Sequence, residues 1–284
     1  MTKTGRVYYS NKDREYFLEL TRNLNFIANG NLNRTLDKML IVSKYTKEKL
    51  TRFFEKNGVI HILVGNFSDK NSDWIFNQVS IFLNDLLKKM KIDDVRKISM
   101  IKKDLISHEL DQFINYIEKA VELKVKFVRP DYDYIDKWLR VDYIGLSSES
   151  VGVISLLLDK ENNLKFNTIS KNENIDFKES VLTIAIEAIM TIIRGNMIGY
   201  PRWISIKLGF QKYRFLSFKK LENQFFLYCI TEGNLEKLES LETALNPYLE
   251  DGVSIKFIGS LKPFNEIKNK IRDFIGTISE RKFY

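Results

Sequence analysis

The feature that most constrains the fold is the hydrophobic pattern between Val141 and Leu249. Short apolar, β-branched runs alternate there with helical periodicity in the order β-β-α-β-β-β-α. The central helix, Phe177 to Ile193, is apolar on most of its faces, which is typical of a helix packed against a sheet and a further element. The pattern therefore predicts an α+β domain in which helices flank a five-stranded antiparallel sheet.

Turn residues divide this half of the chain into elements. A hairpin is predicted from Val141–Leu158 and Asn163–Ile169, with its turn at Asp159–Asn163. A meander of three strands follows the central helix: Trp203–Leu208, Phe215–Leu221 and Phe225–Ile230. The pattern ends with three further elements: a helix over Leu235–Leu249, a strand over Val253–Ile258 and a helix over Phe264–Ile278.

The first half of the chain repeats much of this order. It predicts a helix, three strands and a helix: Asp13–Ala28, Met39–Val42, Leu50–Phe54, Val59–Val64 and Trp74–Leu87. The segments Leu50–Asn66 and Leu216–Asn234 share strand order, turn position and a Gly-Asn exit. Two diverged copies in tandem explain this likeness, and coincidence of α+β patterning is the alternative.

The two copies predict two domains, residues 1–128 and 129–284, with a helix over Val95–Val121 between them. The first copy has no partner for the opening hairpin of the second except Arg6–Tyr9. We therefore expect its sheet to be smaller, or to be completed by another element or chain.

Composition limits the class of protein. Hydrophobic residues make up 44% of the chain, charged residues 29%, and there are only four prolines, so we expect nearly all of it to fold. No apolar run has the length and character of a secretory signal or a transmembrane segment, and the single cysteine, Cys229, cannot form an internal disulfide. These features predict a cytoplasmic protein. The net charge of +8 permits attraction to nucleic acid, an anionic membrane or an acidic protein, without choosing among them.

The element order from Val141 to Leu249 resembles that of the longin and roadblock superfamilies. Three segments carry the resemblance: FKESVLTIAIEAIMTIIRGN, WISIKLGFQKYRFLSFKKLENQFFLYCITEGN and LEKLESLETALNPYLE. The resemblance implies a non-catalytic scaffold in trafficking or signalling. It would bind a small GTPase, its regulator or another such chain, and form homo- or hetero-oligomers through sheet edges or helices.

No constellation of residues typical of an enzyme appears. The phosphate-binding patterns G-x-x-x-x-G-K-[ST] and G-x-G-x-x-G are absent from the sequence. Neither His61 nor His108 has a cysteine or histidine at metal-ligand spacing, and Cys229 lies in an apolar run where a thiolate is disfavoured. We therefore expect no catalytic residue, cofactor or metal.

Two other functions stay open. Basic and aromatic residues alternate around Phe215, so a nucleic-acid or anionic-surface contact would use Lys207, Lys212, Arg214, Lys219 and Lys220. An ordinary solvent-exposed sheet face would show the same alternation of basic and aromatic residues. A metal-dependent enzyme would use Asp131, Asp133 and Asp136, although a linker with solvated charges is the favoured interpretation of that segment.

Overall fold

The computed structural model describes residues 9–10, 15–30, 35–43, 49–56, 59–65, 69–92, 98–122, 132–148, 151–159, 164, 174–196, 199–254 and 257–284. Contacts divide the chain into two compact units. Unit 1 comprises Met1–Arg22 and Lys49–Asp131, and unit 2 comprises Asn23–Glu48 and Tyr132–Tyr284. The domain boundary predicted at residues 128 and 129 lies outside the described residues.

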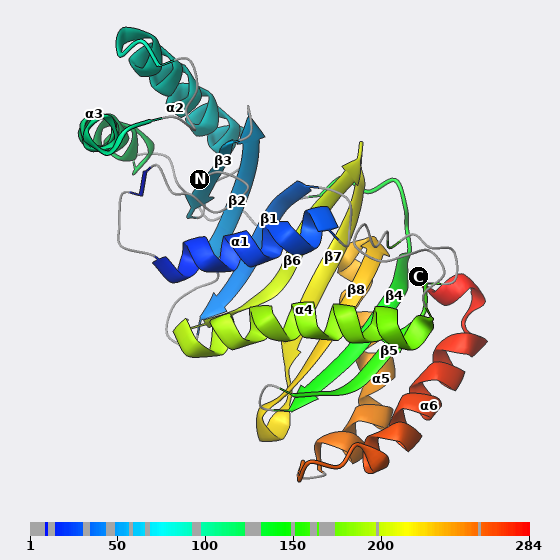
Figure 1. Ribbon diagram of the computed structural model, residues 1–284. Coiled ribbons are helices and arrows are strands. Elements are labelled where there is room, and N and C mark those ends of the chain that lie inside the picture. Colours follow the sequence, from blue (N-terminus) through cyan, green and yellow to red (C-terminus); the bar gives the residue numbers. More distant parts are fainter. Residues whose placement is uncertain are drawn as a thin grey trace. The chain divides into compact units, whose positions relative to one another are not determined.

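Unit 2 holds most of the described elements (Figure 1). Its strands are β1 (Thr35–Ser43), β4 (Leu139–Ser148), β5 (Val151–Leu157), β6 (Gly199–Gly209), β7 (Lys212–Lys220), β8 (Phe225–Gly233) and β9 (Lys282–Phe283). Its helices are α4 (Ile175–Asn196), α5 (Leu238–Val253) and α6 (Lys262–Thr277), with short 3₁₀ turns η2 (Glu222–Gln224), η3 (Leu235–Lys237) and η4 (Ser279–Arg281). Helix α1 (Glu15–Gly30) begins in unit 1 and ends in unit 2.

The strands of unit 2 form one antiparallel sheet in the order β1-β6-β7-β8-β4-β5. The predicted order β-β-α-β-β-β-α is confirmed by β4, β5, α4, β6, β7, β8 and α5. The expectation of five strands is wrong, because β1 adds to the edge of β6 and β9 pairs with the start of β4. The strand predicted at Met39–Val42 in the first domain thus belongs to the sheet of unit 2.

Helices cover both faces of this sheet (Figure 1). On one face, α5 and α6 bury an apolar core that includes Ile144, Leu227 and Ile271. On the other face, α4 packs through Leu182, Ile186 and other fully buried side chains.

Hydroxyl groups seat α4 on its face of the sheet. The Tyr143 hydroxyl lies 2.9 Å from both the Ser155 and Thr183 hydroxyls. Gly145 makes room beside them, because a Cβ there would lie 1.9 Å from the Tyr228 ring. The hydroxyls of Tyr143, Ser155 and Thr183 therefore have partners, as buried hydroxyls require.

Two predicted elements differ from the structure. The hairpin turn lies between β4 and β5, after Ser148, because the Ser-rich run there interrupts what looks like one long apolar strand. Apart from Leu164, the predicted strand Asn163–Ile169 lies outside the described residues. Val253 belongs to α5, and Phe257 and Ile258 are not in a strand, since Phe257 packs on the core below α6 instead.

Unit 1 contains the hairpin of β2 (Lys49–Lys56) and β3 (Val59–Val64), followed by helices α2 (Asp69–Lys89) and α3 (Met100–Glu122). The register pairs Lys56 with Val59, as the predicted turn requires, and the two turn residues lie outside the described ones. The helices meet through stacked rings of Phe82 and Phe113, whose centroids are 4.1 Å apart. Within the described part of the chain, none of the helices has the length and apolar character needed to cross a bilayer.

Candidate functional site

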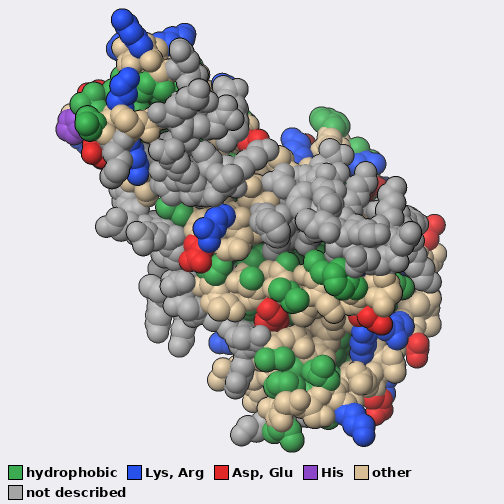
Figure 2. All heavy atoms as spheres, in the orientation of Figure 1, with side chains coloured by type: hydrophobic (Ala, Val, Ile, Leu, Met, Phe, Trp, Pro, Cys, Tyr) green, Lys and Arg blue, Asp and Glu red, His purple; other side chains and the backbone are tan. Residues whose placement is uncertain are grey.

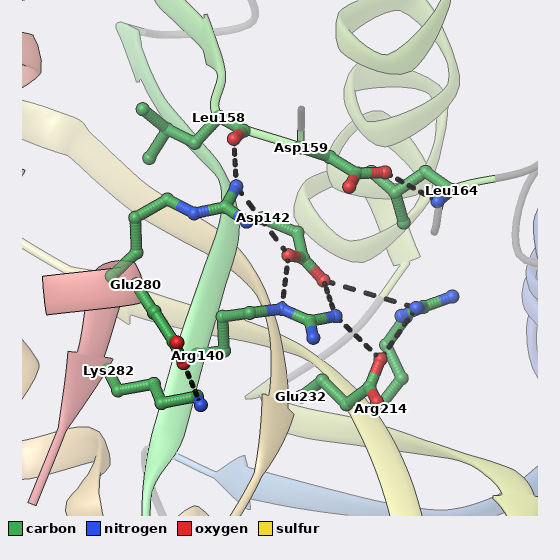
Figure 3. A network of polar contacts seen from close by, with 10 residues as sticks. Arg140, Asp142, Leu158, Asp159, Leu164, Arg214, Glu232, Glu280 and Lys282 are labelled. Carbon is green, nitrogen blue, oxygen red and sulfur yellow. Dashed lines mark hydrogen bonds and ion pairs between the residues drawn. The ribbon is translucent and has the colours of Figure 1, made fainter. Parts of the chain in front are cut away.

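The densest group of charges surrounds a bulge in β4 (Figure 3). Val141 pairs with Thr231 and Tyr143 with Ile230, so Asp142 is the extra residue and its carboxylate is fully buried. The Arg140 guanidinium donates to both carboxylate oxygens of Asp142, at 2.9 and 3.2 Å. A bidentate pair of this kind fixes the direction of both side chains.

Strands distant in the sequence complete this charge network, which we define as Arg140, Asp142, Arg214, Glu232 and Arg281. Glu232 on β8 accepts from Arg140 at 3.0 Å and from Arg214 on β7 at 2.7 Å. Arg281, from η4, donates to the carbonyl oxygen of Leu158 and lies 4.0 Å from the Asp142 carboxylate. The network therefore joins three adjacent strands of the sheet to the segment after α6.

The electrostatics of the network fit a structural role, in which the charged side chains bind one another and hold the strands together. Burial raises the pKa of Asp142, while the hydrogen bond from Arg140 acts in the opposite direction. Asp159, which accepts from the Leu164 amide at 2.6 Å, lies near enough to influence Arg140. The five residues of the network carry three positive and two negative charges, and the nearby Asp159 supplies a third carboxylate.

The structure separates the five basic residues predicted to form one contact. Arg214 is buried in the charge network, and Lys219 lies 3.4 Å from the Glu242 carboxylate of α5. Because side chains alternate along a strand, Arg214 and Lys219 lie on opposite faces of β7. Lys207 and Lys212 are exposed near the β6–β7 turn, and Lys220 is exposed at the other end of β7.

The predicted aspartate cluster is only partly described. Asp131 lies outside the described residues, Asp133 is exposed and Asp136 is half-buried. Among the residues that can be described, no three His, Cys, Asp or Glu side chains are placed to hold a metal ion. The carboxylate nearest in sequence, Asp142, is committed to arginines.

The histidines and the cysteine lie in unlike environments. His61 is half-buried in β3, where burial lowers its pKa to about 4, and its ring lies 6.0 Å from that of Phe54. His108 is exposed on α3, with its Nε2 3.1 Å from the Gln112 side-chain amide. Cys229 is buried in the core beneath α5, and burial raises the pKa of its thiol.

A second candidate is the outward face of α4. This outer stripe, which we define as Phe177, Val181, Ile184 and Ala188, follows the helical repeat. Phe177 is 47% exposed and Ile184 70% exposed, although the inward residues of the same helix are fully buried. Hydrophobic side chains are visible where α4 crosses the front of the sheet (Figure 2). The helix was predicted to pack against the sheet and a further element; among the described residues, its sheet-facing side is buried and its outward side carries exposed apolar side chains.

The charge network was not predicted from the sequence, although the position of Asp142 indicated it. Asp142 stands inside the apolar run Leu139–Leu146, where a carboxylate needs a buried cation. The partners, however, come from β7, β8 and η4, and local patterns do not give this register.

Comparisons of the chain with family models, curated proteins and solved structures yield no match.

Proposed function

We propose that the chain is a non-catalytic interaction protein of the longin or roadblock type that binds a partner protein through the outer stripe of α4. The observation that carries the proposal is the exposure of Phe177 and Ile184 on a helix whose outward face has no charged residue between them. Exposed apolar residues aligned on one element mark interaction sites more often than single ones do.

The architecture of unit 2 supports this class. The element order and the helices on both faces of the sheet agree with the resemblance found in the sequence. Tandem duplication gains support from the order α1-β1-β2-β3-α2, which repeats that of α4-β6-β7-β8-α5. Such a module would act in the cytoplasm, in trafficking or signalling.

The β5 edge of the unit 2 sheet favours the helix as the binding surface. At β5, the Leu157 amide donates to Glu179 of α4 at 2.8 Å, and the same carboxylate accepts from Lys268 of α6 at 2.7 Å. An edge closed in this way resists addition of another strand. We therefore assign partner binding to the outer stripe, and the partner to a small GTPase, its regulator or a second chain of this type.

The test is a charge placed in the stripe. Ile184→Glu adds a carboxylate at a site that is 70% exposed, so we expect the fold to persist and partner binding to fall at least tenfold. The matched control is Ile258→Glu, which changes an 82% exposed isoleucine elsewhere in unit 2.

Binding is measured by pull-down of small GTPases in both nucleotide states, and self-association by light scattering. A parent chain that captures no GTPase and stays monomeric contradicts the proposal. So does equal binding by the two variants.

A further inference from the structure

The turn between β6 and β7 carries an aromatic side chain at its apex. β6 ends at Gly209 and β7 begins at Lys212, so Phe210 and Gln211 form the turn. Gln211 adopts the left-handed conformation, with φ 52°, and Phe210 is 79% exposed. Tight hairpin turns favour Gly, Asn and Asp, which take such conformations at little cost. The residue preferences of a tight turn therefore do not explain why a phenylalanine occupies position 210.

A second exposed apolar residue lies beside this turn. The amide of Ile135 donates to the Gln211 carbonyl oxygen at 3.4 Å, and Ile135 is 53% exposed. Beneath them, the half-buried rings of Tyr134 and Tyr213 lie 6.1 Å apart. Two segments distant in sequence thus present apolar side chains above an aromatic base.

Lysines flank the apolar pair. Lys207 and Lys212 are exposed on the two strands next to the turn, and the residues that the structure describes include no carboxylate paired with either. Lys137 adds a third exposed cation, opposed in part by Asp133 and Asp136. Figure 2 shows a protruding hydrophobic side chain between Lys or Arg side chains at this end of the hairpin.

We propose that this hairpin tip, defined as Ile135, Lys207, Phe210 and Lys212, inserts into the surface of an anionic lipid bilayer. Apolar side chains enter the boundary of the acyl chains while lysines contact lipid phosphates. Tyr134 and Tyr213 lie at the depth where amphipathic rings are favoured. The tip is far smaller than the roughly 20–30 residues that a stable protein interface uses on each side, which favours a bilayer as its occupant. The inference is independent of partner binding by α4.

Vesicle sedimentation tests the proposal with the full chain. We expect binding to vesicles of phosphatidylcholine with phosphatidylserine, and little binding to phosphatidylcholine alone. Phe210→Ser should weaken binding about tenfold. Replacing both Lys207 and Lys212 by glutamine should weaken it about 25-fold, because each lysine near an anionic surface contributes about fivefold.

The matched controls are Ile258→Ser and Lys220→Gln, which change an exposed isoleucine and an exposed lysine away from the tip. Both should bind anionic vesicles as the parent does. Absence of vesicle binding by the parent overturns the proposal, and so does equal binding by tip and control variants. Loss of a protein partner, without any vesicle binding, would make the tip a protein contact and also overturns it.

Insertion can be measured directly because Cys229 is buried. An environment-sensitive fluorophore on Phe210→Cys should shift to the blue on anionic vesicles only, whereas the same label on Lys220→Cys should not shift. A label at residue 210 that stays in water on vesicles that bind the protein contradicts insertion.

Discussion

The last helices of the two units treat their apolar residues differently. In unit 2, α6 buries Phe264, Ile267, Ile271 and Ile275 against α5 and the sheet, and its remaining face is largely polar. In unit 1, α3 buries Ile106, Leu110 and Ile117, partly against α2. It also leaves three large apolar side chains exposed: Ile101 at 83%, Leu105 at 57% and Tyr116 at 69%.

The difference follows from what each helix has to pack on. α6 lies against both α5 and the strand pair β4–β5, so its whole apolar face is covered. The part of unit 1 that the structure describes has no strand pair corresponding to β4–β5. Burial of apolar area is the main favourable term in folding, so unit 2 should hold most of the stability of the chain.

The largest difference in stability is expected when one isoleucine of each helix is replaced by alanine. Ile271→Ala removes a fully buried side chain from α6 and should lower the free energy of unfolding by about 2–5 kcal/mol. Ile101→Ala changes an 83% exposed residue of α3 and should alter it by less than about 0.5 kcal/mol. Urea unfolding of both variants measures the two effects. Similar losses would show that α3 packs on something as α6 does.

The second largest difference should appear at low pH, where unit 1 should lose more stability than unit 2. Both histidines of the chain lie in unit 1, and burial lowers the pKa of His61 to about 4. An unfolded histidine takes up its proton near pH 6.5, well before the folded one does, so stability is lost as the pH falls below that value. From about pH 7 to about pH 5 the loss should reach about 2 kcal/mol.

Hydrogen exchange, expressed as protection factors, locates this loss. Amides of β2 and β3 should lose protection while those of β7 and β8 keep it, and His61→Leu should remove most of the pH dependence. Equal loss in both units, or an unchanged pH dependence in the variant, contradicts the assignment to His61.

The smallest effect concerns the closed edge of β5. Lys268→Met leaves the Glu179 carboxylate, which is 7% exposed, without its cation. The cost should be about 1–2 kcal/mol, below that of a fully buried pair because Lys268 is 22% exposed. Lys270→Met removes the exposed pair with Glu266 on the same helix and should cost no more than about 0.5 kcal/mol. Thermal unfolding compares them, and equal costs would mean that Glu179 does not need Lys268.

Local pattern predicted the elements whose signals are local. β3 was predicted over the residues it occupies, because Asn57-Gly58 and Gly65-Asn66 bound the apolar run between them. α4 and α6 were predicted within a few residues at each end. The hairpin turn after Ser148 was missed because serines end a strand less distinctly than Asn-Gly does.

Contacts between distant segments could not be predicted. The pairing of β1 with β6 depends on register across the sheet, which hydrophobic periodicity does not encode. For the same reason Arg214 was grouped with the exposed lysines. It lies on the same face of β7 as Leu216 and Phe218, which are both buried. This spacing of two residues from buried side chains was the available sign that Arg214 points into the protein.

The pairing of β1 with β6 has a consequence for synthesis. Lys38 and Ser205, which meet across these strands, are 167 residues apart, and the larger segment of unit 1, Lys49–Asp131, is made between them. At ordinary translation rates β1 waits on the order of ten seconds for its neighbour. Throughout that interval the edge of β1 that β6 later covers keeps open hydrogen-bonding groups, and such an edge can pair with another chain.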